Sequence, residues 1–93
     1  MRVRVRIDPN CRFDIGERTP ESRSLVAQYV KGFIDFVAEH LGRPPGALAL
    51  GGQPPMYFWS DANWRIEYVV ERTRRRVTVT ILGVERVSGG DRA

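Results

Sequence analysis

The sequence predicts an α+β fold in which one long helix packs on one face of an antiparallel-rich four-stranded sheet, in the order β-α-β-β-β. Three observations lead to this prediction: a strictly alternating segment at 2–7, a wide apolar helical face at 20–41, and a hairpin pattern at 63–87. A helix with such a face must cover the apolar side of the sheet. We therefore expect residues 1–93 to form a single domain, with 88–93 as a frayed tail.

The first strand is expected at residues 2–7, RVRVRI, where arginines alternate with apolar residues. The segment 8–10, Asp-Pro-Asn, ends this strand because proline donates no hydrogen bond to a ladder and Asp and Asn favour turns. Residues 10–18 fit either a short extended piece or a turn of helix. The outer face of the strand carries Arg2, Arg4 and Arg6.

The helix is expected to begin after Thr19, which is suited to the N-cap, with Pro20 at the first helical position. Gly42 provides a left-handed stop, and the two prolines at 44–45 prevent continuation. The face that should pack on the sheet recurs every four residues: Leu25, Tyr29, Phe33, Val37 and Leu41.

Residues 42–55 are rich in glycine and proline, and we interpret them as a connector. No Lys-Ser or Lys-Thr follows the glycines, so the pattern of a phosphate-binding loop is absent. Residues 56–60, MYFWS, predict a strand, and 61–63 predict a turn after it.

The last two strands are expected to form a hairpin with its turn at 72–75, which places Glu71 opposite Arg76. The apolar pairs on one face would be Val70–Val77, Tyr68–Val79 and Ile66–Ile81. The polar face would pair Val69–Thr78, Glu67–Thr80 and Arg65–Leu82.

The chain carries 15 Lys+Arg against 11 Asp+Glu, a net charge of +4, and Lys31 is its single lysine. Arginine grips phosphate bidentately, which suits nucleic acid; a GC-rich genome would also favour arginine. A single cysteine, Cys11, and a single histidine, His40, make no disulfide or metal set, so no metal or cofactor is expected. With no apolar run of membrane-spanning length and no signal-peptide core, we expect a cytoplasmic protein without a membrane partner.

Two segments of the hairpin, WRIEY at 64–68 and LGVER at 82–86, together with the element order, resemble the RelE/ParE toxin superfamily. The resemblance implies a RelE-like fold, a toxin of a toxin–antitoxin pair, and an antitoxin protein as partner. RNA-cleaving members inhibit translation by cutting messenger RNA in the ribosome. By resemblance, Arg65 and Arg86 match the two catalytic sheet arginines that neutralise the scissile phosphate, and both are expected near one end of the hairpin.

The chain departs from the cleaving members at 87–93, where neither a tyrosine nor a histidine is present as acid or base. An mRNA endoribonuclease therefore stands beside two alternatives. One is a gyrase-directed toxin, and the other is a module that binds protein or nucleic acid without catalysis.

The remaining arginines leave two interpretations open. The turn arginines form either a solvated turn or a contact with ribosomal RNA or an acidic antitoxin; they are Arg72, Arg74, Arg75 and Arg76. Arg2, Arg4 and Arg6 either discourage aggregation at a sheet edge or bind nucleic acid. The aromatic residues of the sheet either pack in the core or offer a stacking surface for bases; they are Tyr57, Phe58, Trp59 and Trp64.

Overall fold

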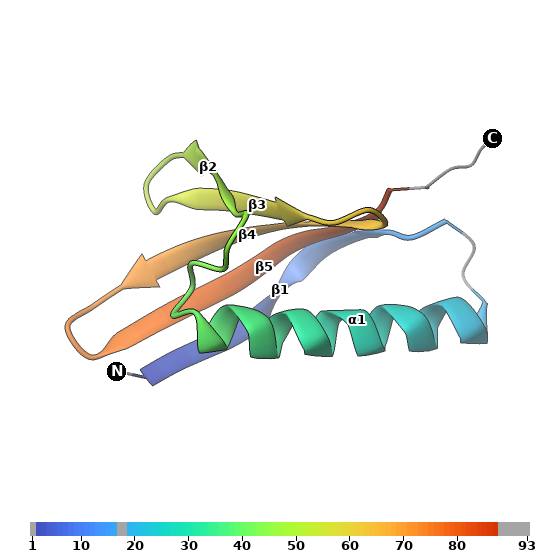
Figure 1. The fold of residues 1–93 in the computed structure, drawn as a ribbon, viewed down its shortest axis with the longest axis horizontal. Helices are drawn as coiled ribbons and strands as arrows, with labels where there is room; N and C mark the ends of the chain where they lie inside the picture. Colours follow the sequence, from blue (N-terminus) through green and yellow to red (C-terminus); the bar gives the residue numbers. More distant parts are fainter. Residues whose placement is uncertain (1, 17–18, 88–93) are drawn as a thin grey trace.

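The computed structural model describes residues 2–16 and 19–87, and the expected tail at 88–93 lies outside them. One helix packs against one five-stranded sheet with strand order β1-β5-β4-β3-β2 (Figure 1). β1 runs parallel to β5, and all other neighbouring strands are antiparallel. The elements are β1 (Arg2–Asp14), α1 (Pro20–Glu39), β2 (Leu48–Gly51), β3 (Met56–Ser60), β4 (Trp64–Arg72) and β5 (Arg76–Arg86).

The α+β class is confirmed, but the sheet differs from the prediction in strand number and direction. β2 lies inside the predicted connector 42–55; all four of its residues are exposed, so no alternation of burial marks it. β1 continues to Asp14 instead of ending at 8–10. Its register with β5 shifts between Ile7 and Arg12, so Pro9 falls where the ladder is already interrupted and its missing N–H costs little.

The start of α1 agrees with the sequence. The Thr19 hydroxyl accepts a hydrogen bond from the Ser22 amide at 3.1 Å, and the Ser22 hydroxyl accepts one from the Thr19 amide at 3.0 Å. This reciprocal capping satisfies two amides that have no partner within the helix. The helix ends at Glu39, two residues before the predicted Leu41.

Gly42 closes the helix and lets it approach the sheet. Its φ of 85° is in the left-handed region, and its amide donates to the Val37 carbonyl at 2.8 Å. A Cβ at this position would lie 3.1 Å from Val77 Cγ1 and 3.3 Å from Val70 Cγ1. Glycine is therefore required both by the backbone conformation and by the packing of β4 and β5.

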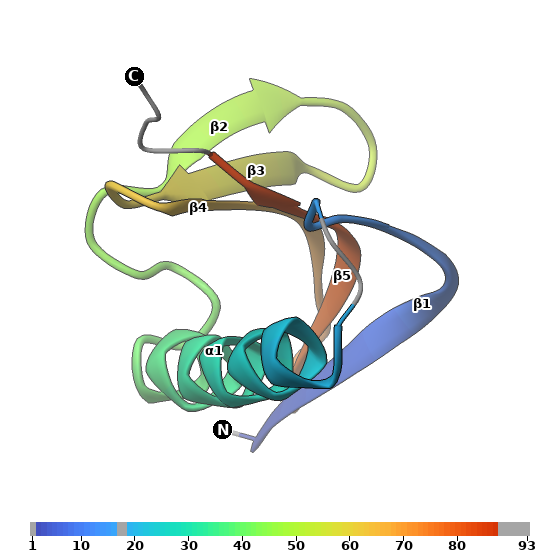
Figure 2. The same ribbon diagram turned by 90° about the vertical axis from the view of Figure 1, so that its right-hand side faces the viewer.

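The core lies between α1 and the concave side of the sheet, which curves around the helix (Figure 2). Phe33 contacts the rings of Tyr68 and Trp59 at centroid distances of 5.6 and 5.7 Å. Of the predicted apolar face, Phe33 and Val37 are buried and Tyr29 is partly buried, whereas Leu25 and Leu41 at its two ends are exposed. The buried residues of helix and hairpin are Val26, Val30, Phe33, Val37, Ile66, Tyr68, Val70, Val77, Val79, Ile81 and Val84.

The predicted hairpin register is wrong by two residues. The Thr73 amide donates to the Arg76 carbonyl at 2.9 Å, so the loop contains Arg74 and Arg75 alone. A shift of two residues keeps every side chain on its predicted face, which is why the alternation could not exclude it. A further shift between Glu67 and Tyr68 moves the later pairs again. The observed pairs include Val70–Val79, Tyr68–Ile81, Ile66–Val84, Arg65–Glu85, Glu67–Gly83, Val69–Thr80 and Glu71–Thr78.

Candidate nucleic-acid interface

The side of the sheet away from α1 is here called the open face. It is convex, because the sheet wraps around the helix on its other side (Figure 2). Its side chains alternate with the buried ones along each strand. They include Arg2, Arg4, Arg6 and Arg12 of β1, Met56 and Phe58 of β3, Arg65, Glu67, Val69 and Glu71 of β4, and Arg76, Thr78 and Thr80 of β5.

Six arginines meet at the end of the open face where β1 begins and the β4–β5 hairpin turns. Arg2 is the parallel partner of Arg76, and its amide donates to the Arg75 carbonyl at 3.3 Å. Two pockets share Arg75 and Arg76; one of about 450 Å³ is also lined by Arg4 and Arg6. We call this set the arginine cluster: Arg2, Arg4, Arg6, Arg74, Arg75 and Arg76.

The arginine cluster carries almost no compensating charge. Residues 2–16 and 19–87 contain three ion pairs, and none of them includes an arginine of the cluster. Glu71 is the one acidic residue among the described residues that line the two pockets. Like charges on neighbouring strands repel one another, so the cluster forms an unbalanced positive surface at this end of the open face.

Arg65 and Arg86 lie near one end of the hairpin, as expected, but their side chains are on opposite faces of the sheet. They occupy adjacent levels of the ladder, because Arg65 pairs with Glu85 and Trp64 pairs with Arg86. The Arg65 guanidinium lies on the open face, 3.8 Å from the Glu85 carboxylate and 5.3 Å from the centre of the Phe58 ring. The expectation that both arginines grip one phosphate is therefore not met.

Arg86 belongs to the helix side of the sheet. Its guanidinium carbon lies 5.8 Å from the Trp64 ring, and that ring stacks on Tyr29 of α1 at 4.6 Å. Consecutive residues of a strand point to opposite faces, so the pairing of Arg65 with Glu85 already places Arg86 on the other side.

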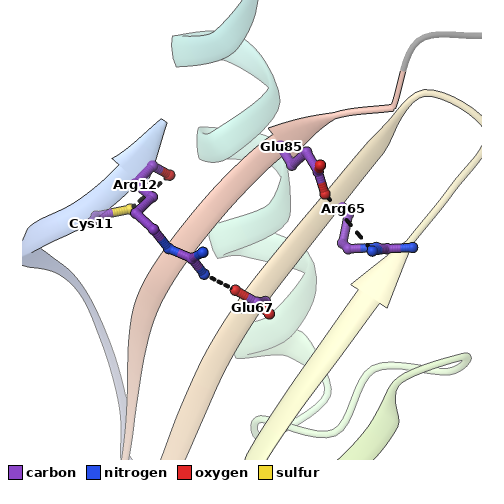
Figure 3. Close-up of polar contacts among 5 residues, drawn as sticks. All are labelled: Cys11, Arg12, Arg65, Glu67 and Glu85. Carbon is purple, nitrogen blue, oxygen red and sulfur yellow. Dashed lines mark hydrogen bonds and ion pairs between the residues drawn. The ribbon is translucent and has the colours of Figure 1, made fainter. Parts of the chain in front are cut away.

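An ion pair that the sequence did not reveal crosses β5 between its two neighbours. Arg12 of β1 contacts Glu67 of β4, and Gly83 lies between them in both ladders (Figure 3). A Cβ on Gly83 would lie 3.1 Å from Arg12 Nη2 and 3.2 Å from Glu67 Oε1. The sequence feature that could have indicated this ion pair is Gly83, because a glycine inside a strand often marks a close approach of other groups.

The pocket around this pair is electrically mixed. Arg12 and Arg65 line it together with the carboxylates of Asp14, Glu67 and Glu85. Because acidic groups outnumber the guanidinium groups, this end of the open face attracts anions far less than the arginine cluster does.

Several polar groups that could do acid–base chemistry are instead held neutral. Burial, with Asp61 nearby, raises the pKa of Tyr29, whose hydroxyl donates to Asp61 Oδ2 at 3.3 Å. Burial raises the pKa of Tyr68 to about 12, and it also raises the pKa of the Cys11 thiol, with Asp8 adding to the effect. None of these groups is therefore primed as a base or a nucleophile near neutral pH.

His40 caps the end of α1, where its Nδ1 lies 3.0 Å from the Phe36 carbonyl. In the part of the chain that the structure describes, no three His, Cys, Asp or Glu side chains gather as possible metal ligands. No helix in the described part of the chain is both long and apolar enough to cross a membrane.

An apolar groove of about 480 Å³ lies between α1 and β1, on the helix side of the sheet. Ile7 is 43% exposed in it, and Arg23 and Lys31 stand at its edge. The remaining lining residues are Phe13, Ile15, Val26, Ala27, Val30 and Ile34.

Comparison with known proteins finds no family model that matches the chain, and no curated protein or solved structure with significant similarity to it.

Proposed function

We propose that this protein binds RNA through the arginine cluster and acts as the toxin of a toxin–antitoxin pair. The observation that carries the binding proposal is the concentration of six arginines, without an ion pair among the described residues, at one end of the open face. The toxin proposal is supported by the hairpin segments WRIEY and LGVER, which lie in β4 and β5.

The physical basis of binding is charge neutralisation. Each phosphate that an arginine contacts releases a bound counterion, so the affinity for single-stranded nucleic acid falls with salt with a slope of roughly 0.7 per contact. Guanidinium groups add two parallel hydrogen bonds to each phosphate, which lysine does not provide. The pairing of β1 with β5 fixes the backbone of Arg2 beside that of Arg76 before RNA binds.

Messenger RNA cleavage is the more specific form of the proposal, but the positions of Arg65 and Arg86 do not favour it. Arg65 and Arg86 leave the sheet on opposite faces, so they do not form one phosphate site. The toxin action that we favour is therefore inhibition of translation by RNA binding. A gyrase-directed action is the alternative that the resemblance also implies.

RNA binding is tested by fluorescence anisotropy with a labelled RNA over a series of KCl concentrations. The variant Arg4→Gln/Arg6→Gln should bind more weakly and lower the salt slope by about 1.4, that is, roughly 0.7 for each lost contact. The matched control is Arg23→Gln/Arg43→Gln, which removes the same charge from exposed positions outside the cluster. Equal losses in both variants would show that only net charge matters and would refute the proposed site.

The toxin role is tested by induced expression in a bacterial host. We expect growth arrest with a fall in protein synthesis, and weaker arrest from the Arg4→Gln/Arg6→Gln variant. Primer extension on cellular messenger RNA separates cleavage from gyrase-directed action. Normal growth with normal translation would refute the toxin role but leave the RNA-binding result intact.

The apolar groove favours a second candidate function, which is binding of a protein partner such as an antitoxin. Ile7 and its apolar neighbours offer a surface for an amphipathic segment, and Arg23 and Lys31 at the edge suit acidic side chains on it. Calorimetry with the purified product of an adjacent small reading frame tests this function. Ile7→Gln should weaken that complex, whereas Arg4→Gln/Arg6→Gln should not.

A further inference from the structure

The open face has a second region, in which apolar and aromatic side chains replace the arginines. Phe58 of β3 is half-buried and has Leu48 of β2 as its cross-strand neighbour. Leu48 is 56% exposed. Such a patch on the polar side of a sheet is unusual for a small monomeric domain and suggests a ligand with flat apolar faces.

The planar group that distinguishes this region is the guanidinium of Arg65. It lies over the Phe58 ring, 5.3 Å from the ring centre, and about half of the Arg65 side chain is exposed. Its ion pair with Glu85 is long, at 3.8 Å, and is open to solvent, so it restrains Arg65 weakly. Aromatic rings and arginine planes are the two kinds of surface on which proteins stack unpaired bases.

The arginine cluster and this platform lie on the same face at a distance that suits a strand of RNA. Arg76 begins β5 beside Arg2, and Gly83, seven residues later, is level with Glu67 and therefore with Phe58. At about 3.3 Å per residue, the two regions are separated by roughly 23 Å along the strand. A chain of several nucleotides therefore reaches both.

We propose that the open face selects single-stranded over duplex RNA, with Phe58 and the Arg65 guanidinium as the platform on which a base stacks. This inference rests on the proposed RNA binding by the arginine cluster. In a duplex the bases are stacked on one another, so they offer no free face to Phe58. Unpaired bases do offer a free face to Phe58. The arginine cluster, in contrast, binds the phosphates of both single-stranded and duplex RNA.

The test measures affinity for three probes of about 12 nucleotides: an unstructured single strand, the same RNA annealed to its complement, and an abasic sugar–phosphate strand. Phe58→Leu keeps an apolar side chain but removes the ring. It should weaken binding of the single strand by about 5- to 100-fold and leave the duplex and abasic affinities unchanged.

Two further variants separate stacking from a folding defect. Phe58→Tyr keeps a ring and should retain single-strand affinity within about twofold, provided that its circular dichroism is unchanged. Arg65→Lys keeps the charge but removes the planar group, so it should lose part of the preference for single strands.

The outcomes distinguish this inference from the proposal on which it rests. If Phe58→Leu binds the single strand as tightly as the wild type, the platform serves a protein contact or no contact, and the inference is overturned while RNA binding stands. Equal affinity of the wild type for all three probes also overturns it. If the Arg4→Gln/Arg6→Gln variant binds every probe normally, the proposed function itself fails.

Discussion

Arg65 and Arg86 lie at adjacent levels of the β4–β5 ladder, yet their guanidinium groups leave the sheet on opposite faces. Arg65 contacts Phe58 and Glu85 on the open face. Arg86 contacts Trp64 on the side that α1 covers. Two arginines that are close in the fold therefore serve different surfaces.

This relationship predicts different effects of two otherwise similar substitutions. Arg65→Ala should weaken single-stranded RNA binding by several-fold, because it removes both a charge and a planar group from the open face. Arg86→Ala should change the affinity by less than about twofold, because the side chain is on the other face. Fluorescence anisotropy at fixed salt measures both variants. Equal, large losses would mean that the two side chains converge on RNA after all.

A second prediction concerns the ion pair that crosses Gly83. Gly83→Val should separate Arg12 from Glu67, because a side chain on Gly83 would occupy the space in which they meet. In a double-mutant cycle, the coupling energy between Arg12→Ala and Glu67→Ala should fall to near zero from the roughly 0.2–1 kcal/mol typical of exposed pairs.

The matched control for this substitution is Thr78→Val, which alters the same strand and the same face away from the pair. It should leave the coupling between Arg12 and Glu67 intact. Chemical denaturation of the four proteins in each cycle provides the free energies. A coupling that survives in the Gly83→Val background would show that the pair does not depend on the open space over the glycine.

The errors of sequence-based prediction in this chain have a common physical origin. The alternation of Ile66, Tyr68 and Val70 correctly assigned the buried face, because side-chain direction repeats every two residues. The same period makes a slip of two residues invisible, and the register shift between Glu67 and Tyr68 adds a third residue that no alternation indicates. The pairing of Arg65 with Glu85, three residues beyond the predicted Leu82, therefore could not be predicted. That pairing decides which face Arg86 takes.

The sequence identified the six arginines of the cluster as candidate binding residues, but it did not predict that they lie together. The sequence placed Arg2, Arg4 and Arg6 on one face of a strand and the other three arginines in or beside a turn. Their meeting depends on the parallel pairing of β1 with β5, which sets Arg2 beside Arg76. No local pattern specifies a partner strand that is more than 70 residues away in the sequence.

A third prediction follows from the buried hydroxyl of Tyr68. The residue is fully buried, and its hydroxyl makes no hydrogen bond with the described residues. Tyr68→Phe keeps the ring in contact with Phe33 and removes the desolvated polar group. We expect the free energy of unfolding to rise by about 1 kcal/mol, measured by urea denaturation at pH 7. A loss of stability instead would show that the hydroxyl has a partner in solution.

A fourth prediction is that Tyr68 makes the fold sensitive to alkaline pH. Burial raises its pKa to about 12, whereas an unfolded tyrosine has a pKa near 10. The folded state therefore holds the proton more tightly, so the stability from the neutral hydroxyl is fully present below pH 10. It is lost progressively as the pH rises from about 10 to about 12.

Between pH 9 and pH 11 the wild type should consequently lose roughly 1 kcal/mol more than Tyr68→Phe, because the variant has no proton to lose at this position. Urea denaturation at the two pH values measures the difference, and the variant serves as the reference for all other titrating groups. Tyr29, whose pKa burial also raises, adds a separate loss that both proteins share. Parallel decreases in the two proteins would show that the Tyr68 hydroxyl reaches water in the folded state.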